Sequence, residues 1–205
     1  MTRKSGRAMP LSPEERRKSI ITAVIPLLIE HGASVTTKQI AEAAGIAEGT
    51  IFGVFPDKRA LIVEAVRFSM DPEPTREALA EIYPEAPFEV KMAEAGRILM
   101  DRYDRVIALA SILRTLPPPA GHDHRAASPD FVEESNIAIN DSLARIFTES
   151  DVTLRIEPKR AAAAFRSMVL SSRHPYLGGK DRLTIPEIVS VLTRGIIDRE
   201  TIPVP

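Results

Sequence analysis

The sequence of 205 residues contains no cysteine. Without cysteine the chain can form neither a disulfide nor a thiolate metal site, and it has no thiol nucleophile. It also lacks an apolar run of about 20 residues, the length that a membrane-spanning helix needs. The polar N-terminus lacks the apolar segment of a signal peptide. We therefore expect a soluble protein that stays in the cytoplasm and has no membrane partner.

Motifs of common enzyme classes are missing too. There is no Gly-x-Ser-x-Gly, no phosphate-binding glycine loop and no His-Glu-x-x-His helix. Asp101 and Asp104 could be invoked as catalytic carboxylates, but an arginine follows each of them and would neutralise it. His122 and His124 stand one residue apart in a proline-rich loop without a third ligand nearby, which argues against a metal site. We expect no catalytic residue, no metal and no cofactor.

Charge is unevenly distributed, although the formal net charge of the chain is only −1. Residues 1–60 carry nine basic and six acidic side chains, a sum of +3, so residues 61–205 sum to −4. A basic end joined to an acidic body is expected if one end meets nucleic-acid phosphates, although an ordinary solvated surface explains the same charges. The polar residues 1–11, with three basic side chains, are predicted to form a disordered basic arm.

Helical periodicity runs through the chain, and no segment alternates convincingly as a strand does. Prolines and glycines separate the apolar stripes and so mark the ends of the expected helices. Outside the stretch described next, the expected helices are residues 13–30, 58–70, a short one near 76–83, 88–116, 131–147, 159–173 and 187–198. Pro26 is expected to bend the first of them or to divide it. The predicted fold class is all-α.

The most informative stretch is residues 36–58, TTKQIAEAAGIAEGTIFGVFPDK. Thr36 and the glutamine three residues later have the spacing of a capping box, which predicts a short helix that Gly45 ends. A second short helix is expected to include residues 49–52 and to stop at Pro56, because proline cannot continue a helix. Two short helices joined by a glycine-containing turn are typical of the DNA-binding helix-turn-helix, whose second helix enters the major groove.

Local signals predict two more helix starts around this stretch. Ser12 and Glu15 have the spacing of a second capping box at the start of helix 13–30. Asp57 is placed to cap the helix that begins at Lys58.

The ordered residues of this region resemble the N-terminal domain of TetR-type transcriptional regulators. The resemblance rests on residues 45–52, GIAEGTIF, and on a further set: Ile20, Ile21, Ala23, Leu27, Leu28, Gly32, Thr36, Thr37, Ile40, Ala41, Phe55, Asp57, Lys58 and Leu61. It implies a three-helix DNA-binding domain with a helix-turn-helix at residues 12–57. It also implies a helical ligand-binding and dimerisation domain at residues 58–205.

Three features depart from the family pattern. Ala47 stands where a serine usually opens the recognition helix, and Phe52 replaces the usual tyrosine. Gly53 and Val54 occupy positions where the family commonly has large residues that contact phosphate. These departures concern contacts with the DNA backbone rather than the fold. We interpret Ile51, Phe52 and Phe55 as core.

The resemblance and the chemistry of the side chains together define a predicted DNA-binding surface. Threonines and a lysine at a helix N-terminus suit phosphate, while Glu48 and Thr50 have groups that can contact base edges. The alternative is that Glu48 is merely solvated and Thr50 packs internally. The predicted DNA-binding residues are Thr36, Thr37, Lys38, Ala47, Glu48, Gly49, Thr50, Phe52 and Lys58.

The resemblance also implies that the C-terminal helices enclose an apolar pocket and pair with a second subunit. The predicted ligand-binding residues are Met92, Leu99, Met100, Tyr103, Ile107, Phe131, Phe147, Phe165 and Met168, with Arg102, Tyr103, Asn136 and Arg166 as polar groups that could orient a ligand. The predicted dimer interface is Ala161, Ala164, Phe165, Ile188, Val191, Leu192 and Ile196. An ordinary core contact within one chain explains both apolar sets as well.

These expectations describe a homodimeric transcriptional regulator of double-stranded DNA rather than an enzyme. We expect a repressor that leaves a near-palindromic operator when a small apolar effector binds the C-terminal domain. Two other classes stay open: an all-α enzyme or carrier for an apolar small molecule, and a helical interaction module without DNA binding.

Overall fold

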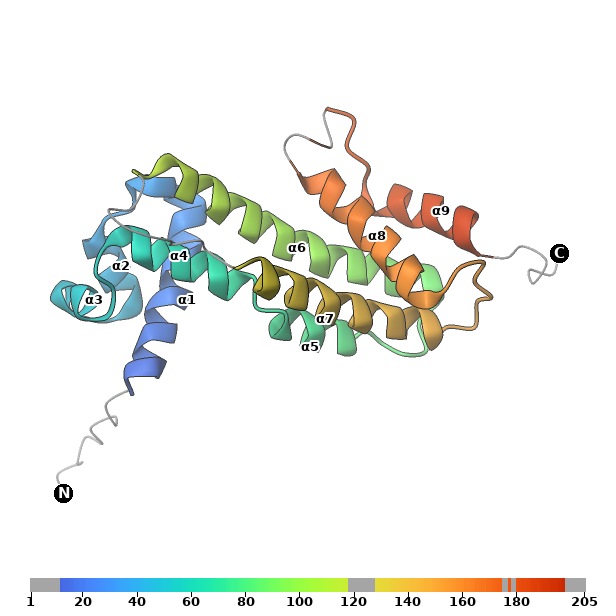
Figure 1. Cartoon of the computed structure of the whole chain (residues 1–205), viewed down its shortest axis with the longest axis horizontal. Coiled ribbons are helices and arrows are strands. Elements are labelled where there is room, and N and C mark those ends of the chain that lie inside the picture. The colour runs from blue at the N-terminus through green and yellow to red at the C-terminus, as the bar shows by residue number, and fades with distance from the viewer. Residues whose placement is uncertain (1–11, 118–127, 175–176, 178–179, 198–205) are drawn as a thin grey trace, which may run out of the picture. The chain divides into compact units, whose positions relative to one another are not determined.

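The computed structural model describes residues 12–117, 128–174, 177 and 180–197 (Figure 1). These residues form nine α-helices and one short 3₁₀-helix, and they contain no strand, so the all-α prediction is confirmed. The elements are α1 (Pro13–His31), η1 (Gly32–Ser34), α2 (Thr37–Ala44), α3 (Glu48–Val54), α4 (Lys58–Ser69), α5 (Glu73–Ala80), α6 (Phe88–Thr115), α7 (Pro129–Thr148), α8 (Pro158–Arg173) and α9 (Ile185–Ile196). None of the described helices combines the length and the apolarity of a membrane span.

α1 runs through Pro26 as one helix. Its predicted capping box is present, because Glu15 N donates to Ser12 Oγ at 3.2 Å and Ser12 N donates to Glu15 Oε2 at 2.8 Å. The hydrogen bond from the Ser12 backbone N–H is the main cause that lowers the pKa of Glu15, and the bond with the Ser12 side chain adds to it. The backbone N–H groups of Ser12 and Glu15, which have no partner within the helix, are therefore both hydrogen-bonded.

Three helices begin two or three residues before their predicted starts: α5 at Glu73, α7 at Pro129 and α9 at Ile185. Each has a proline at its first or second position, and each predicted start lies after that proline. Proline lacks an N–H, but the first N–H groups of a helix have no intrahelical partner, so proline fits there. The predicted histidine pair at positions 122 and 124 lies outside the described residues.

Contacts divide the chain into two compact units, residues 1–68 with 109–126 and residues 69–108 with 127–205. Unit 1 contains α1, η1, α2, α3, nearly all of α4 and the last turns of α6. Its buried core includes Ile20, Val24, Leu28, Ile40, Ile51, Phe55, Leu61, Ile62 and Leu109. Arg59 of α4 donates to Pro117 O at 2.9 Å and thus holds the chain just after α6. Unit 1 therefore includes α4, which the predicted boundary after residue 57 assigned to the second domain.

Unit 2 contains α5, most of α6, α7, α8 and α9. Its core is apolar and includes Leu79, Met92, Leu99, Ile139, Leu143, Phe147, Phe165, Val169, Ile188 and Leu192. The rings of Phe88 and Phe147 meet edge to face with centroids 5.5 Å apart. α6 and the start of α9 approach closely at Gly96, where an added Cβ would lie 2.8 Å from Ile185 Cδ1.

A buried arginine joins four segments of unit 2. Arg102 of α6 is 6% exposed and donates to Met70 O at 2.5 Å, to Asp71 O at 2.6 Å and to Ser135 Oγ at 2.9 Å. Thr75 Oγ1 of α5 lies 3.4 Å away, and Ser135 of α7 itself donates to Met70 O at 2.7 Å. Burial lowers the pKa of Arg102. The guanidinium thus fixes the segment before α5 against α6 and α7.

Candidate nucleic-acid interface

Local hydrogen bonds build the α2–turn–α3 unit. Gln39 N donates to Thr36 Oγ1 at 3.2 Å and Thr36 N donates to Gln39 Oε1 at 2.8 Å, so the predicted capping box is present. Gly45 ends α2 with φ 64° and ψ 35°, a left-handed conformation that glycine adopts without steric cost. Ile46 N then donates to Ala41 O at 3.0 Å. These bonds satisfy the last carbonyls of α2 and set the direction in which the chain enters α3.

α3 is anchored to unit 1 by Ile51 and by Phe55, which directly follows it, and both are buried as predicted. No side chain caps its start, as expected from Ala47. The predicted burial of Phe52 was wrong, because 55% of this residue is exposed. Successive residues of a helix are turned by about 100°, so once Ile51 faces the core Phe52 is directed away from it.

The exposed face of α3 consists of Glu48, Gly49, Phe52 and Gly53, and Thr50 is half-buried at its edge. Spacings of one, four and five residues place this set on one side of the helix. Two of its members are glycines, so the carboxylate of Glu48 and the ring of Phe52 are the side chains that this face offers to a partner. Thr50 is therefore neither fully directed to the outer face, as a base contact requires, nor fully packed in the core.

The first turn of α2 lies next to this face. The Thr37 hydroxyl donates to the Glu48 carboxylate and so joins the starts of the two helices. The Thr36 hydroxyl is engaged by the capping box, and Lys38 is exposed beside it. The fold thus brings together two groups of predicted DNA-binding residues, from the start of α2 and from α3.

Lys58 lies at the start of α4 with its ammonium turned toward the protein. Its Nζ donates to Ala33 O at 2.6 Å and also to Val35 O. Burial lowers the pKa of Lys58. The predicted cap of α4 is present, since Ala60 N donates to Asp57 Oδ1 at 2.7 Å. Lys58 thus holds the segment that leads into α2, and one of its three N–H groups is left for a further acceptor.

Arg17 of α1 was not among the predicted site residues. Its Nη1 donates to Val54 O at 3.2 Å, its Nη2 lies 3.4 Å from the Glu64 carboxylate, and its guanidinium carbon lies 4.7 Å from the Phe55 ring centroid. It therefore connects the end of α3 with α1 and α4. In the sequence it stands among other basic residues near the start of α1, and nothing distinguishes it there from a solvated side chain.

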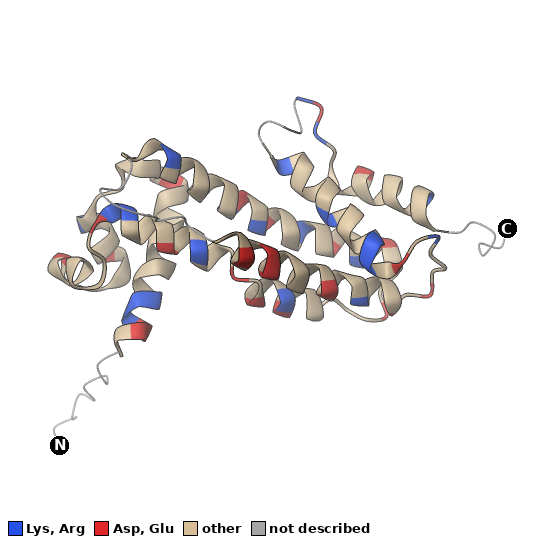
Figure 2. Cartoon of the chain, in the orientation of Figure 1, with Lys and Arg blue, Asp and Glu red and all other residues tan. Residues whose placement is uncertain are grey.

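Charge is mixed over the described residues (Figure 2). α1 carries basic and acidic side chains in its first turns, and acidic side chains recur along α5 and α7. α3 itself contains no lysine or arginine. Attraction to nucleic-acid phosphates must therefore come from the residues that flank α3, such as Lys38, and from backbone N–H groups.

The predicted ligand-binding residues lie in unit 2, mostly in its core. Met92, Leu99, Tyr103, Phe147 and Phe165 are buried, Met100, Ile107 and Met168 are partly buried against the core, and Phe131 is half-buried. The predicted dimer residues divide in the same way: Ala161, Phe165, Ile188, Leu192 and Ile196 are buried within the chain, while Ala164 and Val191 are exposed. Five of the seven positions thus already have a contact within their own subunit.

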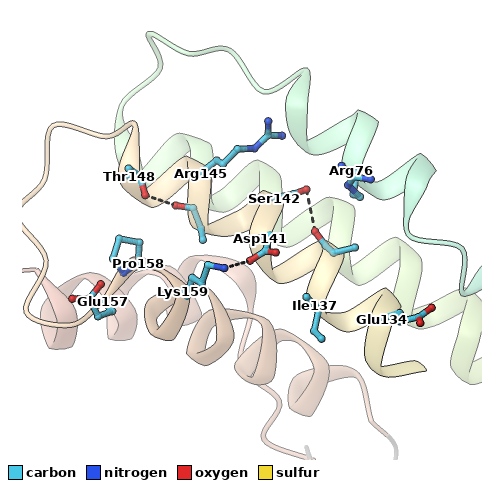
Figure 3. A pocket seen from close by; sticks show the side chains of 12 residues that line it. Arg76, Glu134, Ile137, Asp141, Ser142, Arg145, Thr148, Glu157, Pro158 and Lys159 are labelled. Carbon is cyan, nitrogen blue, oxygen red and sulfur yellow. Dashed lines mark hydrogen bonds and ion pairs between the residues drawn. The ribbon is translucent and has the colours of Figure 1, made fainter. Parts of the chain in front are cut away.

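A separate groove of about 890 Å³ lies along α7 (Figure 3). Its walls come from Arg76 of α5, from α7 positions between Glu134 and Thr148, and from residues 157–159 at the start of α8. Lys159 Nζ forms an ion pair with Asp141 Oδ1 of α7 at 2.8 Å. None of the predicted ligand-binding residues lines this groove.

Residues 20–65 match the family model described as bacterial regulatory proteins, tetR family. The match covers α2 and α3 with the adjoining parts of α1 and α4. The helix-turn-helix of unit 1 therefore matches the DNA-binding domain of tetR-family regulators. No curated protein matches the sequence significantly.

Solved structures share the fold of the chain. A TetR transcriptional regulator from Streptomyces coelicolor aligns with a TM-score of 0.57 and 21% identity, over 89% of this chain and 99% of its own. A protein from Saccharomonospora viridis, described as a transcriptional regulator and solved with choline, aligns at 0.60 and 17%, over 91% and 100%. The TetR-like regulator LfrR from Mycobacterium smegmatis, solved with proflavine, aligns at 0.51 and 17%, over 87% and 92%.

Proposed function

We propose that this chain, which carries a TetR-family DNA-binding domain, is a homodimeric repressor that acts in the cytoplasm and that a small-molecule effector releases from its operator. The observation that supports the DNA-reading role most directly is the exposed face of α3, flanked by the start of α2 through the bond between Thr37 and Glu48. A helix presented in this way fits the major groove.

On this proposal the two helices divide the contacts. The N–H groups of the first turn of α2, with Lys38 and the remaining N–H of Lys58, bind phosphates and fix the register. Glu48, Thr50 and Phe52 face the base edges, where a carboxylate accepts from cytosine and an apolar group contacts the thymine methyl. Ala47, Gly49 and Gly53 contribute close approach of the backbone rather than side-chain bonds.

Dimerisation would use α8 and α9, on which Ala164 and Val191 are exposed. A two-fold axis would place two α3 helices one turn of duplex apart, about 34 to 36 Å, so the operator is expected to be a near-palindrome. The effector site would lie among the partly buried residues of unit 2, such as Met100, Ile107 and Met168. Structures of similar fold that hold choline and proflavine support a small-molecule site.

Release would be a population shift. The effector must bind the conformation that does not fit the operator more tightly than the one that does. A change from mostly bound to mostly free requires a preference on the order of 10⁴-fold.

The test is fluorescence-anisotropy binding to the DNA upstream of the protein's own gene, over a salt series, beside a scrambled duplex. We expect tight binding to the natural duplex that weakens with salt, and weak binding to the scramble. Lys38→Ala should weaken binding to both duplexes and reduce the salt slope by about one. Lys180→Ala, an exposed lysine in unit 2, is the matched control and should change neither. Absence of binding at low salt would refute the proposal.

A further inference from the structure

Unit 2 contains a polar cluster in its interior: Arg102 and Tyr103 of α6, Asn136 of α7 and Arg166 of α8. We call these four residues the interior polar cluster. Arg166 Nη1 donates to Asn136 Oδ1 at 2.7 Å, and Tyr103 is only 7% exposed among apolar core residues. The helices α6, α7 and α8 thus bring polar side chains from three distant parts of the sequence to one place.

Two groups of the cluster are buried without a hydrogen-bond partner among the described residues, the Tyr103 hydroxyl and Arg166 Nε. Burial raises the pKa of Tyr103, and the nearby Arg166 charge opposes this effect without providing a well-formed bond to the hydroxyl. The phenol is therefore a neutral O–H donor. Buried donors are normally paired in folded proteins, so each unpaired one needs an explanation.

The cluster also has an excess of positive charge. The hydrogen bonds of Arg102 go to carbonyl and hydroxyl oxygens, and that of Arg166 goes to a neutral amide. Neither guanidinium forms an ion pair with a carboxylate of the described residues. Asp104 is engaged elsewhere, since both its oxygens accept from Arg173 at 2.6 and 2.7 Å.

At longer range, Asp71 attracts Arg102, while Arg105 and Arg166 repel it. Asp71 bonds Arg102 through its backbone oxygen, whereas its carboxylate Oδ1 accepts from Glu73 N. Among the described residues, the interior polar cluster therefore has two guanidiniums without a paired carboxylate and two donors without an acceptor.

We propose that the interior polar cluster binds the acidic group of the effector, and that the effector is therefore an organic acid with an apolar body. This inference rests on the proposed function, because it specifies the ligand class of the regulatory domain. The carboxylate accepts from Arg166 Nε and from the Tyr103 hydroxyl, and the charge of Arg102 strengthens both bonds. The apolar body contacts partly buried neighbours on the same helices, Met100 and Met168. A cationic ligand such as choline is repelled by both guanidiniums.

A purely structural role makes the opposite prediction for the empty protein. If the donors serve the fold, removing them lowers the melting temperature. If they await a ligand, Tyr103→Phe leaves the melting temperature of the unliganded chain unchanged or raises it, because it removes an unpaired buried donor. Arg166→Gln also removes the bond to Asn136 Oδ1, so only Tyr103→Phe serves for this comparison.

The experiment compares acids with amides of the same skeleton on the full chain by isothermal titration calorimetry. The pairs are octanoate with octanamide and 1-naphthoate with 1-naphthamide, and octyltrimethylammonium is the cationic probe. In at least one pair we expect the acid to bind about tenfold or more tightly than its amide, because only the acid supplies a charge-assisted acceptor. Tyr103→Phe and Arg166→Gln should bring the acid to within about twofold of the amide. Arg160→Gln, an exposed position of α8, is the matched control and should keep the preference.

Equal affinity for acid and amide, no binding by either pair, or tighter binding of the cation would each overturn the inference. So would a lower melting temperature of the unliganded Tyr103→Phe protein. Operator binding is measured on the same preparations. DNA binding without an acid preference rejects the inference alone, whereas an acid preference without DNA binding rejects the proposed function.

Discussion

Arg17, Lys58 and Arg102 each donate to backbone carbonyl oxygens of a neighbouring segment. Carbonyls at the ends of helices and turns lack intrahelical partners, and a long basic side chain can reach them from another element. The sequence shows only that these residues are basic. It predicted a DNA contact for Lys58, a ligand-orienting group at Arg102 and no site role for Arg17. Which carbonyl lies within reach depends on how the helices pack, so these roles could not be predicted from the sequence.

At Arg102 this role predicts a loss of stability. Arg102→Met removes the donors to Asp71 O and Ser135 Oγ, and we expect the free energy of unfolding to fall by about 2 kcal/mol. Arg102→Lys should not restore it, because an ammonium cannot reproduce the planar fork of a guanidinium. Urea denaturation measures the change. Arg105→Met, exposed on the same helix, is the control and should stay within about 0.5 kcal/mol. Equal stability of Arg102→Met and the parent would contradict this role.

Gly45 makes a backbone prediction. At its φ of 64° an L side chain is strained although nothing lies within 4 Å of the added Cβ, so Gly45→Ala should cost about 1 to 2 kcal/mol of unfolding free energy. Gly53 lies within α3 with no neighbour near its Cβ either, and Gly53→Ala should instead stabilise by about 0.5 to 1 kcal/mol. Chemical denaturation of the two variants gives the comparison, and effects of the same sign would show that φ is not the cause.

At the scale of the element, the helix ends that carry local signals could be predicted. The capping boxes of α1 and α2, the glycine turn after α2 and the Asp57 cap of α4 are all present. The third capping box, at the start of α9, was missed because the predicted helix began after the proline within it. Phe52 was misplaced because an apolar residue type does not show which side of a short helix faces the core.

The three capping boxes predict different responses to acid. The pKa of Glu15 is lowered by hydrogen bonds with Ser12, and that of Glu187 by hydrogen bonds with Thr184. In each case the bond from the backbone N–H contributes most. A lowered folded pKa means that the cap contributes above the unfolded pKa and is lost as the pH falls through the folded pKa. In an NMR titration below about pH 4, the amide protons of Ser12 and Thr184 should therefore shift.

The box of α2 is the internal control for this titration. Its acceptor is the amide oxygen of Gln39, which does not ionise, so the amide proton of Thr36 should keep its shift over the same range. A Thr36 shift as large as those of the other two caps would point to general acid unfolding.

At the scale of the whole molecule, the division into units could be predicted only in outline. The match of residues 20–65 to a family model agrees with the N-terminal domain that the motif indicated. That α6 supplies residues to both units could not be seen, because its apolar pattern is continuous from one end to the other. A chain with a similar fold, the Streptomyces protein, is only 21% identical to this one, so the fold is kept although most residues differ.

The proposed dimer makes a prediction at this scale. Val191 of α9 is 54% exposed and belongs to the predicted interface, so Val191→Glu should place a charge there and shift the protein toward monomer. Val90 of α6 is equally exposed, at 53%, and Val90→Glu is the matched control. Sedimentation velocity over a concentration series distinguishes the two. If both variants sediment like the parent, α9 does not form the interface through this residue.

The close approach at Gly96 has a consequence for related sequences. A methyl group at position 96 would need the space that Ile185 Cδ1 and Cγ2 occupy at 2.8 and 2.9 Å, so the two positions share one volume. A relative with alanine or serine at position 96 should therefore carry a smaller residue at position 185, such as valine or alanine. In an alignment of relatives the two columns are expected to covary, and this pairing would record the contact between α6 and α9 without a further structure.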